Sequence, residues 1–304
     1  MRVLVTGATG NVGRLVTKGL VDAGVKVRAL TRNPARAQLP DDVDVMAGDL
    51  TQPDTVRPAL ADVDRMYLFP EASTAREVVA LAARAGVRRV VVLSSGAVTG
   101  GYDTTFHLPV ERAVEESGLE WTHVRPGEFA ANKLSLWGPS IRAERVVRDA
   151  NPDSGWFPVH EQDIADVALA ALLEDGHVGK VYDVNGPSLI SLRDQVRAIA
   201  AAIGEEIRFE ELSPVEARKV YLAQGGFAAE AADFLLGFTD YAGNPADPEE
   251  AADFDPAELG PLPTAEVVTG RPARTFAQWA RDHAADFREP AGANGDRGLH
   301  AADA

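Results

Sequence analysis

The sequence predicts an α/β fold with a doubly wound parallel sheet and a smaller α/β lobe beside it. Short β-branched runs alternate with Ala-rich amphipathic stretches through residues 1–130. Several runs are apolar at every position, as in 90–93, which is typical of parallel strands covered by helices on both faces. Strict alternation of strand and helix gives right-handed crossovers and a doubly wound sheet.

Each element of residues 1–130 is justified by this alternation. Helices are expected over 11–23, 74–85 and 106–117, where apolar residues recur at helical spacing. Strands are expected at 2–6, 25–30, 43–47, 64–69, 89–93 and 121–125.

The alternation loosens after Arg125, where Gly-Pro and Asn-Pro breaks interrupt the chain. Helices are expected at 163–176, at 191–203 and 214–224 with Ser191 and Ser213 as N-caps, and at 275–287. Strands are expected at 180–184 and 206–212. We therefore expect one folded unit over 1–288, with its core in 1–130, a lobe built mainly from 131–288, and a disordered polar tail over 289–304.

Composition excludes several classes of protein. The 304 residues carry 30 basic and 46 acidic side chains, a net charge of −16, which argues against a nucleic-acid binder. The absence of cysteine excludes a disulfide framework and a thiol nucleophile. No apolar run is long enough to span a membrane, and the N-terminus does not resemble a signal peptide. A soluble, cytoplasmic protein is expected.

The strongest local signal is a glycine-rich turn between the first strand and the first helix. Gly7, Gly10 and Gly13 are spaced G-x-x-G-x-x-G. Gly7 permits the tight turn, Gly10 lets the main chain approach a pyrophosphate, and Gly13 lets the helix pack on the sheet. The free N–H groups at the helix start attract phosphate charge. A dinucleotide site is predicted, with Thr9, Asn11 and Val12 completing the turn.

The end of the second strand indicates which dinucleotide is bound. A protein selective for NAD places an acidic residue there to bind the ribose hydroxyls. Here the strand runs into Thr31-Arg32-Asn33-Pro34, with no carboxylate. The planar guanidinium of Arg32 suits a 2′-phosphate. NADP(H) is therefore predicted in preference to NAD(H).

Residues at the ends of the next strands complete the predicted cofactor wall. Asp49 and Leu50 follow the third strand, Phe69 the fourth, and Ser94 the fifth. The carboxyl ends of parallel strands form the crevice in which ligands bind. The serines at 94 and 95 fit helix capping equally well.

These motifs resemble the NmrA-like branch of the atypical short-chain dehydrogenase/reductase superfamily, in particular its NAD(P)H-dependent quinone and azo-compound reductases. The matching segments are 7–14, 31–34, 48–50, 117–119, 125–129 with Asn132, 163–168, 179–182 and 269–272. The resemblance covers roughly residues 1–288. It implies a Rossmann domain with a substrate-side lobe, and it adds Gly127 to the cofactor site.

The tyrosine–lysine pair of standard members of that superfamily is missing. Four residues after the five tyrosines stand Glu71, Phe106, Gly186, Gly225 and Pro245. Reduction of simple ketones by that machinery, in which lysine lowers the pKa of the tyrosine, is therefore disfavoured.

Histidine 107 is the main candidate for catalysis in place of that pair. By resemblance, it falls where quinone-reductase relatives carry a histidine, and Glu111 follows one turn later, where it is expected to orient the ring or raise its pKa. Tyr102 is a second candidate, in a loop over the substrate. His123 reads as a core residue and His160 as a neighbour of a cap at Asp163. No group of histidines and carboxylates has metal-ligand spacing, so no metal is expected.

Two functions remain open from the sequence. The first is an NADPH-dependent reductase that passes hydride to a quinone, an azo bond, an enone or another conjugated acceptor, including an aromatic biosynthetic intermediate. The second is a non-catalytic NADP(H) sensor that docks a partner protein, with the acidic stretch 230–266 as its surface. A small-molecule acceptor is the expected partner, without nucleic acid or membrane, and a homodimer is one arrangement left open.

Overall fold

A seven-stranded parallel sheet forms the centre of the protein. The computed structural model describes residues 1–248, 262 and 264–288. The strand order is β3-β2-β1-β4-β5-β6-β9, with every neighbouring pair parallel, which confirms the predicted fold class. The strands are β1 (Arg2–Val5), β2 (Lys26–Thr31), β3 (Asp44–Ala47), β4 (Arg65–Leu68), β5 (Arg89–Leu93), β6 (Glu120–Pro126) and β9 (Lys180–Val184).

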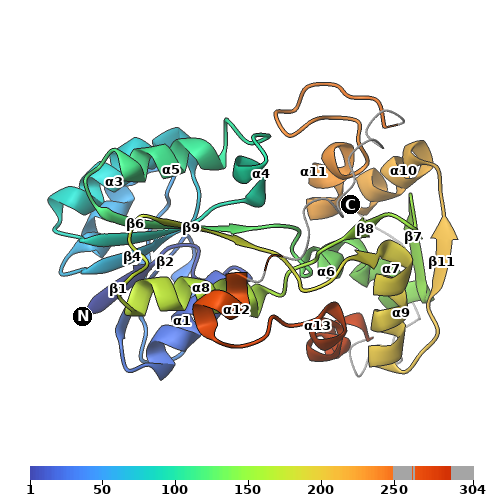
Figure 1. Ribbon diagram of the computed structural model, residues 1–304, viewed down its shortest axis with the longest axis horizontal. Coiled ribbons are helices and arrows are strands. Elements are labelled where there is room, and N and C mark those ends of the chain that lie inside the picture. The colour runs from blue at the N-terminus through green and yellow to red at the C-terminus, as the bar shows by residue number, and fades with distance from the viewer. Residues whose placement is uncertain (249–261, 263, 289–304) are drawn as a thin grey trace, which may run out of the picture.

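Helices cover both faces of this sheet, as Figure 1 shows. Val3 and Val5 pack beneath α1 (Gly13–Asp22) and α8 (Glu161–Leu173) on one face. Leu4 points to the other face, into the core formed with α3 (Ala75–Arg84) and α5 (His107–Glu115). Shorter helices join these elements: η1 (Pro34–Arg36), α2 (Pro53–Val56), η2 (Arg57–Leu60), η3 (Ala72–Thr74) and α4 (Gly96–Thr99).

A smaller lobe with its own core lies beyond the carboxyl ends of the strands. Trp137, Trp279 and Phe287 are fully buried at its centre. Its strands are β7 (Val146–Asp149) and β11 (Arg208–Glu211), which pair in parallel, and β8 (Gly155–Trp156) and β10 (Ile190–Ser191), which pair antiparallel. Its helices are α6 (Asn132–Leu136), α7 (Gly138–Glu144), α9 (Leu192–Ile203), α10 (Pro214–Gln224), α11 (Gly226–Leu235), α13 (Phe276–Asp282) and η6 (Ala284–Phe287). Another helix, α12 (Thr264–Thr269), returns to pack on α8.

The division between core and lobe is less simple than a boundary at residue 130. Helix α8 packs on α1, and β9 extends the main sheet by pairing with β6, so 161–184 belong with the sheet although they follow lobe segments. A periodic pattern reports that a strand forms but not which sheet it joins. Strand β7 and helices α6 and α7 had no clear sequence signal, and the predicted final helix is split into α13 and η6. The predicted disordered tail lies outside the described residues.

The predicted caps of two lobe helices are confirmed, and that of α8 is corrected. Ser191 and Ser213 accept hydrogen bonds from the backbone of the first turns of α9 and α10. For α8 the cap is His160, whose Nδ1 accepts from the N–H of Gln162. Asp163 instead forms an ion pair with Arg274, which ties the segment before α13 to α8. Within the described residues, no helix is long and apolar enough to cross a membrane.

Candidate active site

The glycine-rich turn lies at the point where the order of the sheet reverses. Strand β1 pairs with β2 on one side and with β4 on the other. The strands that follow β1 in the chain are therefore added first on one side of β1, as β2 and β3, and then on the other side, from β4 onward. The Thr6 hydroxyl donates to the Tyr67 carbonyl (3.0 Å) and accepts from the Phe69 N–H (2.7 Å), which joins the ends of β1 and β4. In open α/β sheets, ligands bind in the crevice at this point.

Gly7 permits the tight turn as expected, whereas Gly13 is required by the turn itself and not by packing of the helix on the sheet. Gly7 has a φ of +59°, in the left-handed region. A Cβ at Gly13 would lie 2.1 Å from the Gly7 carbonyl oxygen, so only glycine lets α1 begin against the turn. A Cβ at Gly10 would meet only that same carbonyl, at 3.3 Å, and would otherwise occupy open space above the turn. The turn thus offers a bare, exposed main chain at a helix start, which fits a diphosphate.

The remaining residues of the predicted turn divide by exposure. Thr9 and Asn11 lie exposed at its tip with Gly10, whereas Val12 is buried in the core under α1. The side chain of Val12 therefore holds the helix start, and only its main chain faces the turn.

Two of the predicted cofactor residues, Arg32 and Asp49, follow the adjacent strands β2 and β3. Arg32 is exposed at the end of β2, and Asp49 follows β3. Hydrogen bonds from the backbone and hydroxyl of Thr51 lower the pKa of Asp49, and the positive charge of Arg32 adds to this effect. The ionised Asp49 carboxylate can accept hydrogen bonds from a bound adenosine, and the neighbouring Arg32 guanidinium can donate hydrogen bonds to it.

Other predicted wall residues lie along the same edge. Phe69 is 44% exposed, and its ring approaches Gly7 so closely that a Cβ there would lie 3.0 Å from ring carbons. Leu50 is half-buried and packs on the core beneath α3. Gly127 directly follows β6, and a Cβ on it would lie 2.1 Å from the Asn185 side-chain oxygen.

Ser94 belongs to a buried ion-pair network. Its hydroxyl donates to Glu111, and the Arg125 guanidinium donates to both oxygens of the same carboxylate. Burial alone would raise the pKa of Glu111, but Arg125 and Ser94 hold it below its usual value. The Ser94 hydroxyl is thus committed away from the crevice, and Ser95 is the more accessible of the pair.

The orienting partner of His107 is Asp103 and not the predicted Glu111. His107 Nδ1 lies 2.6 Å from Asp103 Oδ2, not beside the Glu111 carboxylate. Asp103 is fully buried and also accepts from the N–H groups of Phe106 and His107, which lower its pKa against the opposing effect of burial. The pKa of His107 is lowered rather than raised, because burial outweighs the Asp103 charge.

Tyr241 of the lobe, which was not predicted, joins Asp103 and His107 in a cluster that we call the Tyr241 corner. Its hydroxyl lies 3.3 Å from His107 Nδ1, and Ser95 and Asp103 are hydrogen-bonding partners of the same hydroxyl. The predicted Tyr102 is an exposed loop residue whose ring lies over Gly100. The sequence signal for the corner is the spacing of Asp103 and His107, four residues apart. For Tyr241 it is the turn-forming series Asp240-Tyr-Ala-Gly-Asn.

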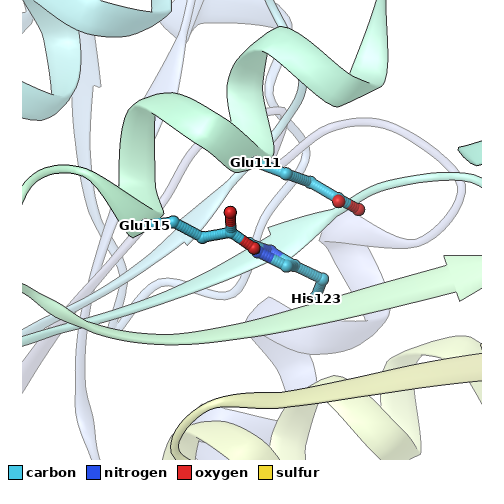
Figure 2. A group of neighbouring side chains, drawn as sticks. All are labelled: Glu111, Glu115 and His123. Atoms are coloured by element: carbon cyan, nitrogen blue, oxygen red, sulfur yellow. The ribbon is translucent and has the colours of Figure 1, made fainter. Parts of the chain in front are cut away.

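Glu111, Glu115 and His123 meet between α5 and β6, in contrast to the expectation that no metal-ligating group forms (Figure 2). One ligand atom from each lies within 4.8 Å of the others. The Glu115 carboxylate lies 3.2 Å from His123 Nε2, and Arg125 occupies both oxygens of Glu111. Because a guanidinium already neutralises Glu111, the group is built as an ion-pair network. His123 is fully buried and stacks on Trp121, as expected of a core residue.

Known proteins with similar sequences bind NAD(P)H or are named reductases, in agreement with a dinucleotide site at the glycine turn. Residues 7–175 match the NAD(P)H-binding family. The chain is 38% identical, over 94% of its length and 99% of the relative, to the (4-alkanoyl-5-oxo-2,5-dihydrofuran-3-yl)methyl phosphate reductase of Streptomyces griseus. The chain belongs to the NAD(P)H-binding family.

Two further proteins are similar over nearly the full length of the chain. The NAD(P)H azoreductase of Xenophilus azovorans is 32% identical over 94% of this chain and 99% of its own. The NADPH complex of the Escherichia coli quinone oxidoreductase QOR2 has the same fold, with a TM-score of 0.70 and 24% identity over 93% of this chain and 99% of its own. The quinone and azo reductase resemblance of the sequence motifs is therefore confirmed.

Proposed function

We propose that the protein is an NADPH-dependent reductase that passes a hydride to a conjugated, electron-poor acceptor. The observation that carries this proposal is the bare glycine turn at the switch point of the sheet, with the Asp103–His107–Tyr241 corner on the same edge. Bound NADPH supplies the hydride, while the chain holds the acceptor and handles the accompanying proton.

Selectivity for NADPH over NADH is part of the proposal. Arg32 stands exposed directly after β2, and the segment 31–34 that ends this strand contains no acidic residue of the kind that selects NAD. A guanidinium binds a 2′-phosphate through two parallel hydrogen bonds. Asp49 beside it accepts from the adenine edge, and its carboxylate is kept ionised by Thr51.

A conjugated acceptor suits both the aromatic surroundings and the missing tyrosine–lysine pair. Phe106 packs edge-on against His107, and Phe234 does the same against Tyr241, while both phenylalanines stay partly exposed. Flat apolar surfaces of this kind favour a planar acceptor. Conjugation spreads the negative charge that hydride transfer creates, so less acid assistance is needed than for a simple ketone.

The named relatives guide the choice of the first acceptors. One acts on a 4-alkanoyl-5-oxo-2,5-dihydrofuran, whose carbon–carbon double bond is conjugated to two carbonyls, and another is an azoreductase. The test follows NADPH absorbance with such an unsaturated lactone, as phosphate ester and as free alcohol, with menadione and with an azo dye. Oxidation of NADPH coupled to one of these acceptors is expected. Absence of turnover with all of them, in protein that binds NADPH, would reject the reductase.

The sensor alternative has no comparable support. Its docking surface was the acidic stretch 230–266, and residues 249–261 lie outside the described part of the chain. In the described part of that stretch, Asp233 is paired with Arg218 and Asp240 holds its own turn. These contacts explain the acidic side chains locally, so the reductase remains the proposal.

A further inference from the structure

We propose that Tyr241 is the proton donor of this reductase, an inference that rests on the proposed function. The lobe brings the Tyr241 hydroxyl to Ser95, Asp103 and His107 at the carboxyl end of β5. The chain thereby replaces the missing tyrosine–lysine pair with a tyrosine from the other side of the crevice.

Tyr241 sits on a turn that is built to hold it in place. Asp240 Oδ1 accepts from the N–H groups of Ala242 (2.9 Å) and Asn244 (2.8 Å), and the Asp240 N–H donates to the Asn244 carbonyl (2.9 Å). Gly243, with a φ of +84°, closes the turn. The segment is therefore a hydrogen-bonded turn that Asp240 holds in place, with Tyr241 as the next residue.

The Asp103–His107 pair that Tyr241 contacts is also held in place by hydrogen bonds. Asp103 is buried and acts only as an acceptor when ionised, so the hydrogen on His107 Nδ1 points to it at 2.6 Å. Nε2 of the neutral ring then carries no hydrogen and cannot donate. Because burial lowers the pKa of His107, the ring is neutral at pH 7. His107 is thus a positioning residue in the resting site, and a different group must supply the proton.

The Tyr241 hydroxyl meets that requirement. Burial raises its pKa, as does Asp103, whereas Ser95 lowers it, so the phenol keeps its proton at neutral pH. The phenol oxygen lies 3.3 Å from His107 Nδ1 and within reach of the Ser95 hydroxyl. The Ser95 hydroxyl is placed to donate to this oxygen as negative charge develops on it, which is the charge stabilisation a proton donor needs. The hydrogen on His107 Nδ1 is held by Asp103, so the ring positions the phenol without donating to it.

Proton transfer from Tyr241 completes a two-electron reduction of the acceptor. A hydride, with its electron pair, is added to one end of the conjugated acceptor, which leaves an anion at the other end and the oxidised nicotinamide. The O–H bond of Tyr241 breaks as a new bond to hydrogen forms on that anion. The phenolate then takes a proton from water. The acceptor is reduced by two electrons, and the protein returns to its starting state.

The test compares Tyr241→Phe with the wild type over a series of quinones, from halogenated to methylated, whose hydroquinone anions differ in basicity. Tyr182→Phe is the matched control, because Tyr182 also bonds a histidine, His177, at 2.7 Å but lies on the outer strand β9. For the most basic product anions, kcat of Tyr241→Phe is expected to fall roughly 100-fold. The loss should shrink steadily as the product anion becomes less basic, while NADPH affinity and thermal unfolding stay unchanged.

Two results would overturn the inference, and they differ from failure of the proposed function. An unchanged kcat in Tyr241→Phe rejects Tyr241 as the donor. A kcat loss that is equal across the quinone series assigns Tyr241 a structural role. If the wild type oxidises no NADPH with any acceptor, the reductase proposal falls and this inference falls with it.

Discussion

The glycine turn and the Tyr241 corner lie on the same edge of the sheet, but they are assembled in different ways. The turn is local, because Gly7 and Gly13 are six residues apart and each is required by main-chain contacts. The corner joins His107 to a tyrosine 134 positions away on another lobe. The proposed diphosphate site is therefore encoded within one strand–helix connection, whereas the proposed proton transfer depends on the packing of two separate cores.

The largest expected effect is at the glycine turn, where Gly13→Ala should lower both the free energy of unfolding and the affinity for NADPH. Its Cβ would lie 2.1 Å from the Gly7 carbonyl oxygen, which is fixed backbone. Relief of such overpacking costs about 1–3 kcal/mol of unfolding free energy. We expect a matching loss in denaturant unfolding, together with loss of NADPH binding in calorimetry.

Gly10→Ala provides the matched control for that variant. A Cβ at Gly10 touches only the Gly7 carbonyl, at 3.3 Å, so stability should change little. The methyl group fills the space through which a diphosphate approaches, so NADPH affinity should still fall. Unchanged NADPH affinity in Gly10→Ala would contradict the assignment of the turn as the diphosphate site.

Arg32→Ala should affect binding alone, without the loss of stability expected for Gly13→Ala, and its effect should be specific to one nucleotide. The loss of a charge-assisted phosphate contact costs about 1.5–3 kcal/mol, which is roughly tenfold or more in the dissociation constant. Calorimetry should show this loss for NADPH and little change for NADH. Because Arg32 is exposed and supports no core contact, folding should be unaffected. Equal losses for both nucleotides would reject its role in selecting NADPH.

The contrast between turn and corner also explains what the sequence predicted. The strands and the glycine turn depend on periodicity and on residues close in sequence, so they were predicted. Asp103 was missed as the partner of His107 because Glu111 has a similar spacing, and only the fold reveals that Arg125 binds Glu111. Tyr241 lies in a segment that reads as a linker. Its role depends on the position of the lobe, which no local pattern encodes.

The smallest expected effect is a pH dependence of stability with opposite signs at two histidines. Burial lowers the pKa of His107 below its ordinary 6.5 in the folded protein. Between pH 6.5 and the folded pKa, the unfolded chain binds more protons than the folded chain. The wild type therefore loses stability relative to His107→Gln as the pH falls through that window. His283 is the counterpart, because hydrogen bonds to Glu161 and Asp286 outweigh the effect of its burial and raise its pKa. Its contribution is present below 6.5 and is lost as the pH rises through the folded pKa.

Unfolding free energies of the wild type, His107→Gln and His283→Gln between pH 5 and 8 would check both signs. The difference between the wild type and His107→Gln should move in favour of the wild type as the pH rises. The difference between the wild type and His283→Gln should move the other way. A His107 difference that favours the wild type at low pH would mean that the Asp103 charge outweighs burial and raises the pKa of the folded ring above 6.5. Below that pKa, Nε2 of His107 would hold a proton, and the histidine would compete with Tyr241 as the donor.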